Sequence, residues 1–274
     1  MLPNQQKRNW KMDLLPEDCI AHICSFATPL DACRMCLVSS TVQCTVDSDS
    51  VWARFLPSNY QDIVATSDDA PFKFSSMKDL FFKLCTPLLI DGGKKVFWLD
   101  KRTAKKCYIL SARELSVTWA SNPLYWSWKP SNGSRFPEVA ELRTVCWLEI
   151  QGSVAAPALS PKSTYEVFLI AQFANTDVAK YHSQTQSFHS SNQPSLEYVC
   201  YSNSTKVLRS RVCGECVQLA RARDDGWIEI KLGEFYNYGF DQEDQQVEMS
   251  RIEVKGVYLK GGLIVEGIEI RVKP

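Results

Sequence analysis

The sequence of 274 residues has little histidine, no excess of either charge and no long apolar run. Lys and Arg together number 31, as do Asp and Glu, so the formal net charge is zero. Proteins that bind nucleic acid through phosphate contacts usually carry a basic excess or stripe, and we expect no nucleic-acid partner. The apolar runs are too short for a membrane helix, and the N-terminal stretch lacks the apolar core of a secretory signal. A location in the cytoplasm and nucleus, away from membranes, is therefore expected.

Catalytic signatures are also lacking. The histidines are His22, His182 and His189, and the sequence contains no G-x-S-x-G, P-loop or H-E-x-x-H motif. A glycosidase would need a pair of carboxylates, and nothing distinguishes such a pair among the glutamates. We expect a protein that is not an enzyme and has no catalytic residues.

Cysteine, by contrast, is abundant, with eleven residues. The odd number and the mostly apolar neighbours favour reduced, buried thiols over disulfides. Two C-x-x-C pairs, Cys33 with Cys36 and Cys213 with Cys216, raise the alternative of a zinc site. A structural zinc needs four ligands, and no second pair follows at the usual distance, so no metal and no cofactor are expected.

Residues 16–56 have the pattern of three short helices. The first begins at Pro16, the second at a capping Thr28 and the third at Asp47 or Ser48. Apolar residues recur along these segments at three- and four-residue spacing. A domain of about 45 residues has a marginal core and cannot bury all of them, so a partner protein is expected to cover the remainder.

The stretches LPEDCIAHICSFATPLDACRMCLVSS and DSDSVWARFLPSNY resemble the F-box found in plant proteins. The resemblance implies docking of a Skp-type adaptor, which in turn binds the cullin scaffold of a ubiquitin ligase. One departure is Val42-Gln43-Cys44, where plant relatives commonly carry a bulky aromatic residue, and this could weaken packing of the third helix. The residues implied to form the small core or to dock the adaptor are Leu15, Pro16, Ile20, Ile23, Leu30, Cys33, Leu37, Val38 and Trp52.

The rest of the chain changes from helical to strand periodicity. Residues 61–76 are polar and rich in turn formers, and a helix capped by Ser76 is predicted over 78–90 as a spacer between modules. From residue 92 onward, seven segments alternate apolar and polar residues, which predicts antiparallel strands with one face exposed to water. These segments are 94–100, 106–112, 144–154, 164–173, 226–235, 247–259 and 261–273.

The predicted fold class is α+β multidomain, with a small helical F-box followed by an all-β antiparallel sandwich resembling a jelly roll. The expected boundaries are a tail over 1–11, the F-box over 12–58, a linker with a short helix over 59–91 and the sandwich over 92–274. Four stretches of the last segment resemble the phloem lectins, also called phloem protein 2-like or Nictaba-like: LSARELSVTWASNPLYWSW, SRFPEVAELRTVCWLEIQG, RDDGWIEIKLGEFYN and VEMSRIEVKGVYLKGGLIVEGIEIRVKP. An F-box joined to such a domain is a known plant arrangement.

A carbohydrate site is expected around the tryptophans of residues 119–128, because sugars stack on aromatic faces while carboxylates and amides bind their hydroxyls. The lectin family uses two tryptophans seven residues apart and two glutamates of the C-terminal region. Trp119 and Trp126 match the spacing, and Glu248 and Glu253 are the nearest acids. Trp128 and Trp147 are more typical of a core. The implied ligand is an N-acetylglucosamine-containing glycan or glycoprotein.

These features predict the substrate-receptor subunit of a cullin-type (SCF) ubiquitin ligase. The F-box would dock the adaptor, and the lectin-like domain would recruit a glycan-bearing target. The alternative is a carbohydrate-binding lectin that acts without a ligase and whose helical segment is a vestige.

Overall fold

The computed structural model describes residues 15–68, 72–174, 196–203, 206–211, 221–239, 245–253 and 261–274, with the backbone alone for 196–203, 206–211 and 253. The chain divides into two compact units, which interleave along the sequence. We call them the helical unit, formed by Met1–Val64, Pro71–Thr86 and Leu99–Ala104, and the sandwich unit, formed by Ala65–Ala70, Pro87–Trp98 and Lys105–Pro274. The expected linker over 59–91 is thus shared between them.

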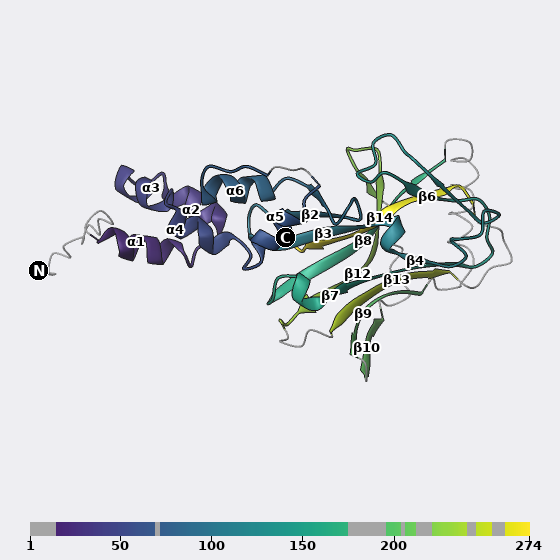
Figure 1. Cartoon of the computed structure of the whole chain (residues 1–274). Helices are drawn as coiled ribbons and strands as arrows, with labels where there is room; N and C mark the ends of the chain where they lie inside the picture. Colours follow the sequence, from purple (N-terminus) through teal and green to yellow (C-terminus); the bar gives the residue numbers. More distant parts are fainter. Residues whose placement is uncertain are drawn as a thin grey trace, which may run out of the picture. The chain divides into compact units, whose positions relative to one another are not determined.

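Short helices build the helical unit (Figure 1). Serine and threonine side chains cap three of them: Thr28, Ser39 and Ser76 each accept a hydrogen bond from a backbone N–H three residues on. Among the described residues, no helix has the length and hydropathy needed to cross a membrane. The helices are α1 (Glu17–Cys24), α2 (Pro29–Met35), α3 (Ser40–Val46), α4 (Asp49–Trp52), α5 (Tyr60–Ala65) and α6 (Met77–Leu84), with a 3-10 turn over Ala53–Phe55.

Trp52 is the centre of the helical core. Its ring lies 5.2 Å from that of Phe81 in α6 and 5.5 Å from that of Phe55. Helix α6 therefore packs inside the helical unit, and the predicted cap at Ser76 is confirmed by the hydrogen bond from Asp79 N–H, 3.1 Å long. The fully buried apolar residues of this unit include Ile20, Cys24, Ala32, Val42, Val46, Val51, Trp52, Leu80, Phe81 and Leu84.

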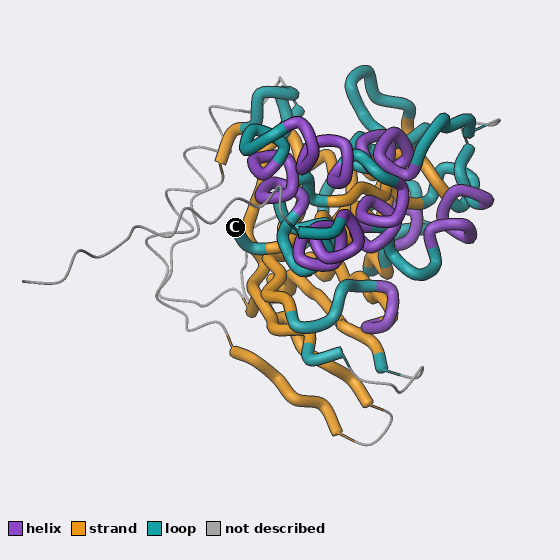
Figure 2. The backbone as a smooth tube through the Cα atoms, turned by 90° about the vertical axis from the view of Figure 1, so that its left-hand side faces the viewer, coloured by secondary structure: helices purple, strands orange, loops and turns teal. Residues whose placement is uncertain are grey.

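Two antiparallel sheets form the sandwich unit, with loops and single 3-10 turns between the strands (Figure 2). All seven strands predicted from the sequence are confirmed. The larger sheet has the order β1 (Leu88–Ile90), β2 (Lys95–Leu99), β3 (Lys106–Ser111), β14 (Leu263–Val272), β8 (Ser163–Phe173), β12 (Ile228–Asn237) and β11 (Arg221–Ala222), and β5 (Trp126–Lys129) and β6 (Val139–Leu142) join it beside β14. The smaller sheet has the order β10 (Lys206–Arg211), β9 (Leu196–Asn203), β13 (Gln246–Glu253), β7 (Leu148–Ala155) and β4 (Ser116–Val117).

The inner faces of the two sheets meet in one apolar core. Gly152 of β7 shows how closely they approach, because a Cβ added there would lie 3.1 Å from the side chain of Ile268 in β14 and 2.9 Å from that of Leu115. Along β7, buried residues alternate with more exposed ones, as the period of two requires. The smaller sheet therefore turns one face to the core and the other outward.

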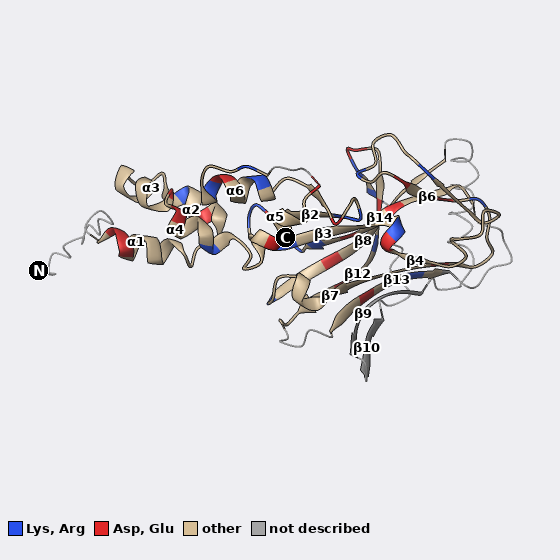
Figure 3. Cartoon of the chain, in the orientation of Figure 1, with Lys and Arg blue, Asp and Glu red and all other residues tan. Residues whose placement is uncertain are grey.

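The outer face of the larger sheet differs from the expectation of a solvent-exposed polar face. Glu229 and Glu269, predicted to face water, are buried. They lie under the guanidinium groups of Arg223 and Arg271, which pair with them. Opposite charges neighbour one another over the described part of the chain (Figure 3), so polar residues of this face bury one another in ion pairs.

Candidate functional site

The helical unit exposes large apolar side chains that a folded core would normally cover. Leu37 is 87% exposed, Phe26 77% and Val38 60%, and Leu15 and Ile23 are exposed as well. We call these five residues the apolar docking face. Clustered exposed apolar residues mark interaction surfaces in soluble proteins. The face arises because α1 and α2 are too short to turn every apolar position inward.

The nine predicted adaptor residues divide by burial. Leu15, Pro16, Ile23, Leu37 and Val38 are exposed, whereas Ile20 and Trp52 are core residues and Leu30 and Cys33 are partly buried. Sequence reasoning placed Phe26 on the apolar helix face but left it out of the adaptor set. Its position three residues after Ile23 was the signal that could have added it. At the predicted departure, Val42 is fully buried in α3, so a smaller residue fills the place of the aromatic.

The cysteine pair of α2 has no metal-site geometry. Burial raises the pKa of the Cys24 and Cys36 thiols, which disfavours the thiolate that metal ligation requires. Within the described ranges, no group of three or more His, Cys, Asp or Glu is placed to hold a metal ion. Cys213 and Cys216 lie outside the described residues.

The two tryptophans that the spacing paired have opposite environments. Trp126 is only 2% exposed, and its indole N–H donates to the Thr118 carbonyl at 3.0 Å. It fixes the 118–125 loop from below and offers no face on which a ligand could stack. Trp119 is exposed, packs on Tyr125 with ring centroids 5.2 Å apart, and has a left-handed backbone with φ of 61°. A bulky residue in that region is strained, which is characteristic of functional loops.

Trp147 was expected in the core, and that prediction is wrong, because its side chain is exposed. The Thr118 N–H donates to the Glu149 carbonyl at 3.1 Å, which continues the β4–β7 ladder beyond β4. The chain segments that carry Trp119 and Trp147 therefore run side by side. Trp128 is partly buried, and Arg113 lies 3.7 Å above its ring.

The outward face of the smaller sheet has a polar cavity of about 210 Å³. We call it the sheet cavity. Residues of β13, β7 and β4 build it, together with the end of the preceding 3-10 turn. Glu248, one of the predicted carbohydrate residues, is part of the lining, whereas nothing is described of the Glu253 side chain. The lining residues are Glu114, Ser116, Gln151, Gly152, Ser153, Gln246, Glu248, Met249 and Ser250.

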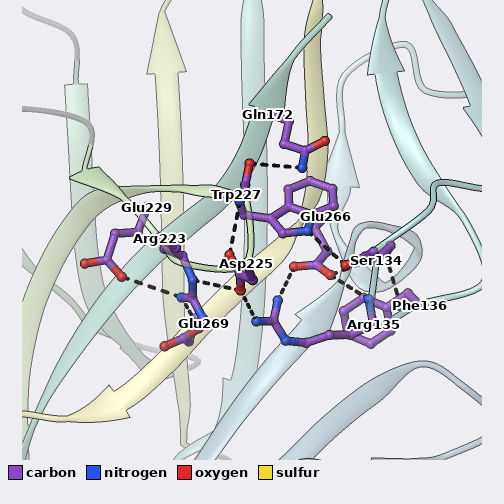
Figure 4. Close-up of polar contacts among 12 residues, drawn as sticks. Ser134, Arg135, Phe136, Gln172, Arg223, Asp225, Trp227, Glu229, Glu266 and Glu269 are labelled. Atoms are coloured by element: carbon purple, nitrogen blue, oxygen red, sulfur yellow. Dashed lines mark hydrogen bonds and ion pairs between the residues drawn. The ribbon is translucent and has the colours of Figure 1, made fainter.

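A charged network fixes the loop that follows the tryptophan cluster (Figure 4). Glu266 sits in a bulge of β14, where the register with β8 shifts between Val265 and Gly267, and its side chain has no exposed surface. Arg135 donates to it twice, from the backbone N–H at 2.7 Å and from Nη1 at 2.6 Å. A bulge re-aims a side chain, and here it directs a carboxylate toward the 130–137 loop.

Trp227 and Asp225 extend this network. The Trp227 indole N–H donates to the Gly133 carbonyl at 3.1 Å, and Asp225 accepts from Arg135, Arg223 and the Trp227 N–H. Burial raises the pKa of Glu266, against the opposing effect of Arg135. For Asp225, the effect of burial is outweighed by the Trp227 N–H and the two arginines, which lower its pKa. The network is an architectural support, and all its described charges are paired.

Comparison with known proteins places both units in described families. The family model for the F-box domain matches residues 12–54, and the model for phloem protein 2 matches residues 105–272. The relative named "F-box protein PP2-B10" from Arabidopsis thaliana is 41% identical over 265 residues, which cover 94% of this chain and 93% of that protein. The chain belongs to the F-box/phloem protein 2 family.

Other members of the F-box/phloem protein 2 family match over a similar extent. "F-box protein At2g02240" of Arabidopsis thaliana is 40% identical over 94% of this chain and 79% of its own length. "F-box protein VBF" of the same species is 37% identical over 96% of this chain and its whole length. A solved structure of a Podospora anserina GH26-CBM35 mannanase aligns with 61% of this chain and 28% of that chain at 6% identity, but its TM-score of 0.30 supports no argument.

Within this family assignment, the apolar docking face belongs to the F-box match and the sheet cavity to the phloem protein 2 match. The expected family and fold class are thus confirmed.

Proposed function

We propose that this F-box/phloem protein 2 chain is the substrate-receptor subunit of an SCF-type ubiquitin ligase. It docks a Skp-type adaptor, and through it a cullin, by the apolar docking face. The carrying observation is the exposure of Leu37, Phe26 and Val38 in a unit whose other apolar residues form a core. Leaving these side chains in water is costly, and an apolar partner surface removes that cost. The subunit acts by bringing a target close to the ligase and performs no chemistry itself.

Co-expression of the full chain with a Skp-type adaptor tests this proposal. The double variant Leu37→Asp/Val38→Asp places two carboxylates in the face, so capture of the adaptor should fall by at least a hundredfold. The matched control is Leu124→Asp, at a residue of the sandwich unit that is 70% exposed, which should leave capture unchanged. Equal capture by the double variant and the wild type would contradict the docking face.

We also propose that the sandwich unit recruits a glycan-bearing target in the cytoplasm and nucleus. Support comes from the exposed Trp119, whose indole face is available for stacking, and from Glu248 in the sheet cavity. A glycan array with N-acetylglucosamine oligomers should show binding by the full chain. Trp119→Ala should weaken it about tenfold through loss of stacking. Unchanged binding by Trp119→Ala would remove Trp119 from the site.

A further inference from the structure

The sheet cavity has one feature that the fold itself does not explain. Along β13, Val247 and Met249 are fully buried in the core, so Gln246, Glu248 and Ser250 point to the other face, where the cavity lies. Ser250 is opposite Gln151 of β7, which is in turn opposite Ser116 of β4. Three neighbouring strands thus place polar side chains in one row across the cavity.

The Ser250 hydroxyl is buried without a hydrogen-bond partner. The residue is 1% exposed, and its Oγ is one of four such side-chain atoms in the described part of the chain. Buried polar groups are almost always paired, so each exception calls for an explanation. The other three, Trp52 Nε1, Ser111 Oγ and Gln245 Oε1, do not line the cavity. Ser250 is the orphan that a molecule in the cavity could satisfy.

The lining defines the chemistry of such a molecule. It contains hydroxyl, amide and carboxylate groups from serine, glutamine and glutamate, and no lysine, arginine or aromatic side chain. An anion would meet the carboxylates of Glu114 and Glu248, and a flat apolar ligand would find no apolar wall. Groups that both donate and accept hydrogen bonds match a ligand with many hydroxyls. The volume suits one sugar ring, since pockets for drug-sized ligands are larger.

We propose that the sheet cavity binds a single uncharged or amine-bearing sugar ring, with the Ser250 hydroxyl as a direct hydrogen-bond partner. The inference rests on the proposed recruitment of a glycan-bearing target and locates the sugar-reading site away from the Trp119 loop. Glu248 and Gln151 flank Ser250 and receive or donate hydrogen bonds to neighbouring hydroxyls of the ring. A terminal residue of a glycan chain enters the cavity, and the remaining rings stay outside.

Titration of the full chain by ¹H–¹⁵N correlation spectroscopy tests the site. The probes are N-acetylglucosamine, mannose and galactose as uncharged sugars, glucosamine as a cation and N-acetylglucosamine 6-sulfate as an anion. At least one uncharged or cationic sugar should shift the amide signals of Gln151 and Ser250, and the sulfate ester should bind at least tenfold more weakly than its parent. Binding of the sulfate ester equal to or above that of N-acetylglucosamine would overturn the proposal, as would a lack of binding by every sugar in the panel.

Ser250→Ala supplies a test that does not depend on unfolding. Removal of an unpaired buried hydroxyl should leave the thermal midpoint unchanged or raise it, yet weaken sugar binding three- to tenfold. Ser111→Ala is the matched control, because Ser111 is equally buried and unpaired but lies in β3, outside the cavity. It should leave the affinity unchanged. Equal affinity of the two variants would refute the role of Ser250. Adaptor capture by the docking face is measured separately, so either proposal can fail alone.

Discussion

Glu266 is a carboxylate without exposed surface, and Arg135 is the cation that compensates its charge. Removing one partner of a buried ion pair leaves the other charge uncompensated, which costs far more than the pair itself contributes. Because Arg135 also holds Asp225, it connects the 130–137 loop to β14 and to the loop before β12. The position of that loop thus depends on one guanidinium group.

We predict that Arg135→Ala lowers the free energy of unfolding by about 3 kcal/mol. The matched control is Lys273→Ala, which removes an ion pair with Glu234 whose two side chains are each 45% exposed and should cost less than about 1 kcal/mol. Denaturant unfolding at neutral pH measures both. Equal losses in the two variants would contradict the burial argument.

Glu229 gives the sandwich an acid-sensitive element. Burial would raise its pKa, but the hydrogen bonds and charge of Arg271, with the charge of Arg223, lower it below the ordinary value. A depressed pKa means that the stabilisation is present above the unfolded pKa of about 4.3 and is lost as the pH falls through the folded pKa. Glu229→Gln should therefore be less stable than the wild type at pH 7, and the difference should narrow below pH 4. Unfolding curves across this range would refute the assignment if the two proteins kept a constant difference.

The sequence indicated which residue types would form a site, but not which of them face solvent. Trp119 and Trp126 lie seven apart in one loop, and the spacing gave them equal weight. Trp126 became a buried support because its N–H could reach the Thr118 carbonyl, a contact that depends on the loop conformation. Trp147 precedes an alternating strand and so resembled a core residue, yet the chain bends there before β7 begins. Burial at loop positions depends on tertiary contacts that periodicity does not encode.

At the scale of elements, strongly periodic segments were predictable and short ones were not. The predicted strands over 106–112, 164–173 and 226–235 correspond to β3, β8 and β12 within a few residues. Helix α3, with the sequence STVQCTV, escaped prediction because β-branched residues have low helix propensity, and packing on α1 and α2 overrides it. Strands β4 and β11 have two residues each, too few for any period.

Strand β14 approaches β3 so closely that one position tolerates only glycine. A Cβ at Gly267 would collide with the backbone carbonyl oxygen of Leu110. We predict that Gly267→Ala destabilises the sandwich by about 2 kcal/mol or more through this overlap. Gly262→Ala, where the added Cβ meets nothing but φ is +78°, should cost only about 1 kcal/mol. Thermal unfolding of both variants measures the effect, and a smaller loss for Gly267→Ala than for Gly262→Ala would contradict it.

At the scale of the whole molecule, the helical unit cannot be removed by a single cut after the F-box. Helix α6 follows α5 and the first segment of the sandwich unit in sequence but packs on Trp52 and Phe55. A chain shortened to residues 59–274 would keep α6 and lose the residues that cover it. Leu80, Phe81 and Leu84, now fully buried, would be exposed to water.

We predict that the 59–274 fragment binds a hydrophobic dye such as ANS and aggregates, because those three side chains form a new apolar patch. The 87–274 fragment, which lacks α6, should bind less dye at the same concentration. Dye fluorescence and light scattering compare the two. Stronger dye binding by the shorter fragment would show that α6 is not the source of the exposed surface.

The place of β14 in the larger sheet sets the order in which the protein can be finished during synthesis. It pairs with β3 and β8 on its two sides, yet it leaves the ribosome later than every other described strand. Until then the larger sheet is open along its middle, while every segment of the helical unit has emerged by residue 104. Since domains tend to fold in the order of their synthesis, an adaptor can engage the nascent chain before any target-reading surface exists.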